Sequence, residues 1–340
     1  MKLRHYPYTL ELKRPFTIAS GSRTATPAVM VELEHEGIVG YGEASMPPYL
    51  GETIETAVSF LSRVNTTLFE DPFRIEEILA EIDRIVPGNT CIKAAIDIAL
   101  HDWTGKKLGL PWHRIWGLDS SVSLATSFTI GIDTPEMISK KTAEADEFEI
   151  LKVKLGSGRD REIVEAVRDI TRKTIRVDAN QGWTDRRHAL ETIEWLAGKN
   201  VELVEQPMPK DRLEDMRWLH ERSPLPLVAD ESVYRLADIA AIKGLFDGVN
   251  IKLMKCTGMH EAHTMITACR ASGLKVMLGC MTETSCAISA AAQLSPLADW
   301  VDLDGALLIC NDLFTGAEIH KGRIILNSLP GIGVTLKSPK

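Results

Sequence analysis

Short apolar segments that end in a charged residue recur through the middle of the chain. The first, residues 148–154, ends in Lys152-Val-Lys154, and the others end in Asp178, Glu205, Asp230, Lys252 and Asp302. Most successive ends lie about 25 residues apart, which is the length of one strand, one loop and one helix. A polar residue at the same place after each strand predicts a (β/α) barrel with its reactive groups at the carboxyl ends of the strands.

Segments with helical periodicity separate these strands. Apolar residues recur at intervals of three and four in residues 135–146, 160–171, 185–199, 211–222, 236–242, 259–272 and 285–294. Residues 123–130 are predicted as the first barrel strand, and Asp302 would end the eighth. The predicted fold class is therefore α/β, a modified TIM-like barrel of the (β/α)7β type.

The first part of the chain follows a different pattern. Strands of an antiparallel meander are predicted at residues 3–12, 28–35 and 41–44, and helices at residues 53–64, 74–85 and 89–107. Residues 14–27 are rich in Gly, Ser, Thr and Pro and are predicted as a long loop. After Gly305 the barrel pattern stops, and short strands follow at 319–326 and 333–336. We expect an α+β capping domain at residues 1–118, the barrel at 119–312, and a C-terminal segment at 313–340 that returns to the cap.

Composition and charge narrow the classes of function. The chain is 44% hydrophobic and 25% charged, as in ordinary globular proteins, and its net charge of -8 argues against a nucleic-acid or anionic-membrane partner. No run of 18 apolar residues is present, and the first residues lack an apolar signal core. The six cysteines form no Cys-x-x-Cys pair. Together these features predict a cytoplasmic protein with buried, reduced thiols.

Three carboxylates end three consecutive predicted strands. Asp178, Glu205 and Asp230 would therefore point into one barrel mouth and converge on one ion. Any one of them alone could be a helix cap or a surface acid. Because all three are hard oxygen donors, the set favours Mg²⁺, with Mn²⁺ as a substitute, over Zn²⁺.

Two lysines end the strands on either side of these acids. Lys154 and Lys252 would lie on opposite sides of the ion, although a lysine taken at random is usually a solvated surface charge. Nearby positive charge disfavours protonation of an amine and brings a lysine toward the range of a general base. Two opposed bases suit removal of a proton α to a carboxylate from one face and its return to the other. The metal would stabilise the enediolate formed between these steps.

The motifs around these residues resemble those of a known family. Lys152-Val-Lys154, Val-Asp178-Ala-Asn180, Val-Glu205-Gln-Pro, Ala-Asp230-Glu231-Ser and Asn-Ile-Lys252-Leu are, in this order, similar to the muconate-lactonizing enzyme subgroup of the enolase superfamily. Sites in that superfamily pair a Lys or His base with Mg²⁺. The resemblance implies one metal per subunit on Asp178, Glu205 and Asp230, with Lys154 and Lys252 as acid and base. It also implies that Lys152 polarises the substrate carboxylate, that Asn180 and Glu231 lie behind the ligands, and that the protein is a homo-oligomer.

The eighth strand end separates reactions within the subgroup. Asp302-Leu-Asp304 resembles the Asp-x-Asp with which dipeptide epimerases bind the free α-ammonium of their substrate. Cys280 and Thr282, in a Gly-x-Met-x-Glu segment, would then border the dipeptide backbone. Cycloisomerases and o-succinylbenzoate synthases share the scaffold but act on substrates without an ammonium. A non-enzymatic binding barrel would not need a base on each face.

Arg23 bears on the choice of dipeptide. The resemblance suggests that this arginine meets a substrate carboxylate, which an arginine binds with two parallel hydrogen bonds. L-Ala-D/L-Glu from peptidoglycan turnover is then the leading substrate. If Arg23 instead faces solvent, a hydrophobic or cationic dipeptide is equally well supported.

Overall fold

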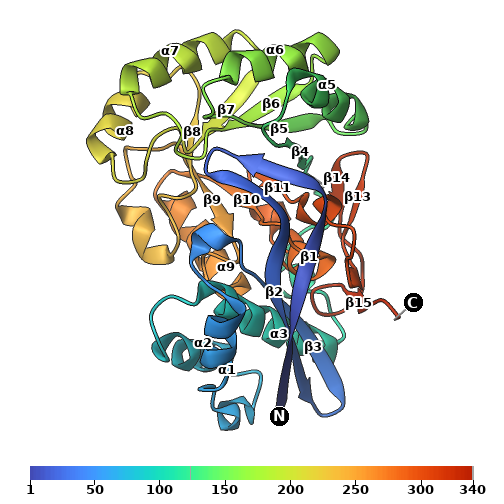
Figure 1. The fold of residues 1–340 in the computed structure, drawn as a ribbon. Helices are drawn as coiled ribbons and strands as arrows, with labels where there is room; N and C mark the ends of the chain where they lie inside the picture. Colours follow the sequence, from blue (N-terminus) through green and yellow to red (C-terminus); the bar gives the residue numbers. More distant parts are fainter. Residues whose placement is uncertain (123, 339–340) are drawn as a thin grey trace.

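The computed structural model describes residues 1–122 and 124–338 and contains an antiparallel sheet with helices beside a parallel barrel (Figure 1). The first sheet has the order β1-β2-β3, with β1 at Lys2–Ile18, β2 at Gly21–His35 and β3 at Ile38–Ser45. The helices that follow are η1 (Pro48–Leu50), α1 (Ile54–Leu61), η2 (Thr66–Phe69), α2 (Ile75–Arg84), α3 (Thr90–Leu108) and α4 (Trp112–Ile115).

Glycines in β3 allow the long helix α3 to lie directly on this sheet. A Cβ atom at Gly42 would lie 1.9 Å from the carbonyl oxygen of Ala95, and one at Gly40 would lie 2.1 Å from that of Ala99. Because such contacts are forbidden, only glycine permits this approach. The buried face of α3 covers one face of the sheet.

The loop predicted at residues 14–27 is wrong. These residues form the tip of a hairpin in which β1 and β2 are joined by a turn at Ala19-Ser20. The register shifts between Glu11 and Phe16, so residues 12–15 bulge out of the ladder. Ser and Thr raised the loop signal, but the Thr, Ile and Phe side chains in this segment also favour extended structure. The tip of the hairpin reaches across the end of the barrel (Figure 1).

The barrel prediction is confirmed. Eight parallel strands follow in sequential order, and a bridge between Thr126 and Val301 closes the sheet. The strands are β4 (Ser127–Ile130), β5 (Ile150–Lys154), β6 (Thr174–Asp178), β7 (Val201–Glu205), β8 (Leu227–Ala229), β9 (Gly248–Lys252), β10 (Lys275–Gly279) and β11 (Trp300–Asp302). Residue 123, the predicted start of the first strand, lies outside the described residues.

The barrel helices lie near their predicted positions, with one exception. They are α5 (Pro135–Glu144), α6 (Asp160–Ile170), α7 (Arg186–Ala197), α8 (Leu213–His220), α9 (Met259–Ala271) and α10 (Ser285–Ala292). The segment predicted as a helix at 236–242 is instead the short 3₁₀ helix η3 (Leu236–Ala240). No α-helix forms among the described residues between β8 and β9. The 3₁₀ turns η4 (Ser295–Leu297) and η5 (Gly305–Leu308) flank the last strand.

Four inward side chains form the floor of the barrel. They come from β7, β8, β10 and β11 and make a buried cluster of their own: Leu203, Val228, Met277 and Trp300. Each lies two residues before a residue at the barrel mouth (Glu205, Asp230, Gly279 or Asp302), and side chains two apart point to the same face of a strand. The apolar layer therefore lies directly beneath the polar layer.

The C-terminal segment touches both parts of the molecule. The predicted strand at 319–326 is a small hairpin, β13 (Glu318–His320) and β14 (Arg323–Ile325), because Lys321 and Gly322 adopt left-handed conformations. Two further short strands, β12 (Phe314–Thr315) and β15 (Thr335–Leu336), pair with each other. Ile332 donates its backbone N–H to Asp102 of α3.

The six cysteines are all free thiols. Four are buried as expected, Cys280 is half-buried, and Cys310 is exposed, so the prediction of burial fails at that position. No helix within residues 1–122 and 124–338 is both long and apolar enough to cross a membrane.

Candidate active site

The three strand-end carboxylates meet at the barrel mouth. Asp178, Glu205 and Asp230 end β6 and β7 and follow β8, and each offers an oxygen within 4.8 Å of the other two. All three are buried. The spacing arises because neighbouring parallel strands present their carboxyl ends at one edge of the sheet.

Lys152 lies at the centre of this cluster. Its Nζ lies 2.7 Å from Asp302 Oδ2, 2.8 Å from Glu205 Oε2 and 3.3 Å from Asp178 Oδ2. Burial alone would lower the pKa of Lys152, but these carboxylates outweigh it and hold the pKa well above its usual value. Lys152 is therefore a fixed positive charge on the barrel axis.

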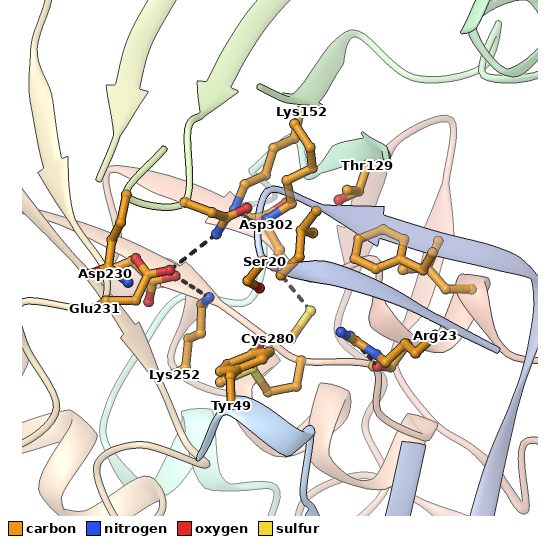
Figure 2. Close-up of a pocket in the computed structure, with 18 of the residues that line it drawn as sticks. Ser20, Arg23, Tyr49, Thr129, Lys152, Asp230, Glu231, Lys252, Cys280 and Asp302 are labelled. Atoms are coloured by element: carbon orange, nitrogen blue, oxygen red, sulfur yellow. Dashed lines mark hydrogen bonds and ion pairs between the residues drawn. The ribbon is translucent and has the colours of Figure 1, made fainter. Parts of the chain in front are cut away.

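Lys154 and Lys252 flank the carboxylates from opposite sides. Lys154 Nζ lies 2.6 Å from Asp178 Oδ2. On the other side, Lys252 Nζ lies 2.6 Å from Asp230 Oδ2 (Figure 2). Their strands, β5 and β9, are four apart in the eight-stranded barrel. Both lysines line the same cavity, of about 180 Å³.

The pKa of Lys252 is raised, whereas the sequence predicts that it is lowered. Burial lowers this pKa, but the charges of Asp230 and Glu205 raise it well above the usual lysine value. The predicted lowering of the pKa is absent because the effect of these carboxylates, of which Asp230 lies 2.6 Å away, outweighs that of the neighbouring cation Lys152.

The carboxylates themselves are electrostatically unequal. Burial would raise the pKa of Asp178, but the charges of Lys154 and Lys152 lower it to about 2. Burial raises the pKa of Glu205 to about 8, assisted by the charge of Asp178. Because burial and a neighbouring carboxylate disfavour the charged form of Glu205, a further cation beside it would stabilise that form.

Asp302 and Asp304 occupy different environments. Asp302 accepts hydrogen bonds from Lys152 and, at 2.6 Å, from the Ser127 hydroxyl. Among the described residues, the Asp304 carboxylate accepts from Thr129 alone, whose backbone N–H lies 2.6 Å from Oδ2 and whose hydroxyl lies 3.2 Å from Oδ1. Burial, with the charge of Asp302, raises the pKa of Asp304 to about 7. Asp304 has no cationic partner among the described residues, so it is the better placed of the two to receive one.

Arg23 faces the cavity from the hairpin. Its Nε and Nη2 donate to the hydroxyls of Thr26 and Thr282, at 3.2 and 3.1 Å, and its guanidinium lies over the Phe16 ring. Burial lowers the pKa of Arg23. It forms no ion pair with any acid in the described part of the chain. Arg23 lies across the cavity from Asp230 and Glu231 (Figure 2).

The remaining predicted residues also line the site. Cys280 donates to the Asp302 carbonyl at 3.3 Å. Asn180 donates to Glu231 at 3.2 Å, beside the carboxylate cluster. Burial, with the charges of Asp230 and Asp178, raises the pKa of Glu231 to about 7. All the predicted site residues thus lie in or against one cavity.

Three neighbours were not predicted from the sequence. Lys255 contacts Asp230 Oδ1 at 2.5 Å and its carbonyl at 2.6 Å, and Asn250 donates to Glu205 at 2.8 Å. Asn250 precedes Lys252 by two residues on β9, so strand alternation could have placed both side chains on the same face of the strand. Tyr49, from η1, lines the cavity opposite the strands, and nothing in the local sequence indicated that position.

Comparisons with known proteins agree along the whole chain. Residues 3–117 match the family model of the mandelate racemase/muconate lactonizing enzyme N-terminal domain, and residues 137–340 match the enolase C-terminal domain-like family. An L-Ala-D/L-Glu epimerase of Bacteroides thetaiotaomicron is 58% identical over 335 residues, which is 98% of this chain and 88% of that protein.

Solved structures show the same fold. A dipeptide epimerase from Enterococcus faecalis V583, complexed with Mg and L-Leu-L-Tyr, has a TM-score of 0.93 at 34% identity and covers 98% of this chain and 99% of its own. A substrate-liganded L-Ala-D/L-Glu epimerase from Bacillus subtilis has a TM-score of 0.93 at 28% identity, with 98% of both chains covered.

Proposed function

The chain belongs to the mandelate racemase/muconate lactonizing enzyme family of the enolase superfamily, and from this premise we propose that it is a Mg²⁺-dependent dipeptide epimerase. The observation that carries the proposal is the pair of lysines on opposite sides of the carboxylate cluster. Lys154 and Lys252 stand on strands four apart and open into one cavity. One lysine removes the α-proton of the C-terminal residue, and the other delivers a proton to the opposite face.

The donor set fits a magnesium ion. Asp178, Glu205 and Asp230 offer three carboxylate oxygens close together, and oxygen ligands of this kind suit Mg²⁺ or Mn²⁺. Glu231 Oε2 and Asn180 Oδ1 are buried beside them without a hydrogen-bond partner in the described structure. A bound divalent ion would supply positive charge that offsets the carboxylates and favours the enediolate form of the substrate. The same charge would weaken the attraction that raises the pKa of Lys252.

The ends of a dipeptide match the remaining charges. Asp304 is a buried acid without a cationic partner in the described chain, and a substrate α-ammonium would provide one. Lys152, close to the carboxylate cluster, is placed to attract the substrate carboxylate. Cys280 and Thr282 line the same cavity and would border the peptide backbone. This arrangement holds the α-carbon of the second residue between Lys154 and Lys252.

Arg23 supports an acidic second residue. It is half-buried in the cavity wall, and within the described residues it is bound by two threonine hydroxyls and an aromatic ring alone. A substrate side-chain carboxylate would give it an ion pair. L-Ala-D/L-Glu, from murein peptides handled in the cytoplasm, is therefore the preferred substrate that we propose, and a homo-oligomer is the proposed assembly. A cationic second residue would be repelled, and cycloisomerase substrates would leave Asp304 without a partner.

Proton exchange in D₂O tests the two-base assignment. We expect the wild-type protein with Mg²⁺ to epimerise L-Ala-L-Glu and to incorporate one deuterium at the glutamate α-carbon. Lys154→Ala and Lys252→Ala should each abolish epimerisation. Each variant should still exchange the α-proton of one diastereomer, and the two variants should differ in which one, because each retains the base on one face. Mass spectrometry and NMR report both quantities.

A matched control is a lysine on a barrel strand away from the mouth. Lys275 is exposed at the first position of β10, and Lys275→Ala should epimerise at the wild-type rate. Normal epimerisation by both active-site variants would exclude the two-base mechanism. Absence of exchange with every dipeptide would exclude the proposed function.

A further inference from the structure

A further buried lysine lies behind the carboxylate cluster, and we propose that this residue, Lys255, is a positioning residue that fixes the orientation of Asp230 for the metal. The inference rests on the proposed function, because Asp230 is one of the proposed Mg²⁺ ligands. Lys255 is only 2% exposed. The described residues that line the active-site cavity include Lys154 and Lys252 but not Lys255, so Lys255 is not placed to exchange a proton with a substrate.

The ammonium group of Lys255 has an acceptor for each of its three N–H groups. Its Nζ lies 2.5 Å from Asp230 Oδ1, 2.6 Å from the Asp230 carbonyl oxygen and 3.1 Å from the Asn250 carbonyl oxygen. A lysine ammonium has three donors and no acceptor. Lys255 therefore uses its whole hydrogen-bonding capacity on the ends of β8 and β9.

These contacts restrict rotation of the Asp230 side chain. One ammonium binds both Oδ1 and the main-chain carbonyl of the same residue, so a turn of the carboxylate would break the contact with Oδ1. The Asp230 N–H is held as well, because it donates to Gln206 Oε1 at 3.0 Å. The second oxygen, Oδ2, is then the one that meets Lys252, which lines the cavity.

The other two proposed ligands are held in a similar way. Asp178 Oδ1 accepts the backbone N–H of Asn180 at 2.9 Å, and Glu205 Oε1 accepts from Asn250 Nδ2 at 2.8 Å. A lysine at the mouth contacts the second oxygen of each carboxylate. Each ligand thus has one oxygen bound to the surrounding protein and one directed toward the mouth. For the third ligand, the residue that binds the first oxygen is Lys255.

The turn that carries Lys255 is fixed at both ends. At its start, the Lys255 N–H donates to the Lys252 carbonyl at 2.9 Å. At its end, Asp97 of α3 accepts the backbone N–H of Met259, the first residue of α9. Gly258 lies directly against Asp97, where a Cβ atom would be 2.3 Å from Oδ1. The Lys255 backbone is therefore held between the barrel and the N-terminal domain, as a positioning group requires.

A positioning role and a simple charge effect predict opposite changes when Lys255 is replaced. A positive charge beside the proposed metal site repels a second cation, so if charge alone mattered, Lys255→Met would strengthen Mg²⁺ binding. In a positioning role, Lys255→Met frees Asp230 to turn both oxygens toward Lys252, and that ion pair competes with the metal. Loss of a group that orients a metal ligand weakens metal binding by about 10- to 100-fold.

Calorimetric titration of the whole chain with Mg²⁺, without a dipeptide, tests this inference. We expect Lys255→Met to bind Mg²⁺ about 10- to 100-fold more weakly than the wild type. Lys255→Gln should also bind more weakly, because its side chain is one bond shorter and cannot reach both Asp230 oxygens. Lys243→Met, at an exposed lysine after η3, makes the same change of charge and should keep the wild-type affinity. Thermal unfolding shows whether each variant is folded, and Lys255→Gln decides if Lys255→Met is not.

The Mg²⁺ dependence of epimerisation gives a second measurement. Because Lys255 acts through the metal ligand, a high Mg²⁺ concentration should restore the kcat of Lys255→Met for L-Ala-L-Glu toward the wild-type value. Lys154→Ala and Lys252→Ala should not be restored, since each lacks a base. Activity of Lys255→Met that stays lost at saturating Mg²⁺ would overturn the positioning role.

The outcomes separate this inference from the proposed function. Mg²⁺ binding as tight as in the wild type, or tighter, in a folded Lys255 variant would overturn the inference, while epimerisation by the wild type would leave the proposed function intact. If the wild type binds Mg²⁺ but exchanges the α-proton of no dipeptide, the proposed function fails, and weaker Mg²⁺ binding by the variants still supports the role of Lys255. If the wild type does not bind Mg²⁺, both proposals fail.

Discussion

The barrel mouth and the hairpin that crosses it hold their charged residues in contrasting ways. At the mouth, Lys152 contacts three carboxylates, and Asp230 is bound by both Lys252 and Lys255. On the hairpin, the contacts of Arg23 with the described residues are two hydroxyls and an aromatic ring. The charged side chains at the strand ends thus pair with one another in a rigid network. The guanidinium of Arg23 on the hairpin, in contrast, has no acidic partner among the described residues.

This contrast separates reaction from selectivity. A proton transfer needs bases held in a fixed place, and strand ends provide that because each side chain is constrained by its neighbours. Selection of a substrate side chain needs a group whose interactions are completed by the ligand. Changes at the mouth should therefore affect every dipeptide, and changes on the hairpin should affect some dipeptides more than others.

Asp230→Asn should have the largest effect. It removes a proposed metal ligand and leaves Lys252 and Lys255 without their carboxylate. We expect weak or absent Mg²⁺ binding by calorimetry and a fall in kcat/KM of about a thousandfold or more for all dipeptides alike. Asp211→Asn, at an exposed acid in the loop after β7, is the control and should retain both properties. Wild-type Mg²⁺ affinity in Asp230→Asn would contradict the metal assignment.

Arg23→Met should have a smaller and selective effect. Loss of a charge-assisted contact should lower kcat/KM for L-Ala-L-Glu by about 10- to 100-fold, while L-Ala-L-Leu is affected little or improves. Steady-state kinetics with both dipeptides measures the change. Arg4→Met, at an exposed arginine on the neighbouring strand β1, should leave both values unchanged. An equal loss for both dipeptides would show that Arg23 acts on structure and not on selectivity.

Glu43→Gln should have the smallest effect. This residue lies at the contact between the N-terminal sheet and the barrel. Glu43 on β3 is buried against the start of α10, where it accepts from Thr284 and Ala287. Burial raises its pKa to about 7, although the Thr284 hydrogen bonds oppose this. The folded protein therefore binds a proton more tightly at Glu43 than the unfolded chain does. Its stabilising contribution is complete at acidic pH and is lost as pH rises through about 7.

Denaturation across this pH range measures that contribution. Between about pH 5 and pH 8, the unfolding free energy of Glu43→Gln should fall less steeply with pH than that of the wild type, by up to about 1 kcal/mol per pH unit. The slope is the quantity to compare, because the amide also changes the hydrogen bonds to Thr284. Glu70→Gln, at an exposed acid, should keep the wild-type slope. Parallel slopes for Glu43→Gln and wild type would refute the assignment.

Most of the barrel was predictable because its signals are local and repeated. Each strand carries its own apolar run and its own charged end, so an error in one unit does not displace the others. The hairpin was missed because Ser, Thr, Gly and Pro favour turns, while the pairing of β1 with β2 that makes them strands is a tertiary contact. The helix prediction at residues 236–242 was wrong because a helical period in the sequence does not reveal how much space the tertiary structure leaves for a helix between two strands.

The sequence by itself determined the order Lys, Asp, Glu, Asp, Lys along the barrel, and with it the kind of chemistry at the mouth. Strand alternation and a fixed repeat length were sufficient for that. Only the tertiary structure decided that Arg23 turns into the cavity, and that the Asp302 carboxylate is paired with Lys152 while that of Asp304 is bound by Thr129. These facts depend on contacts between residues more than a hundred positions apart, and no local pattern records them.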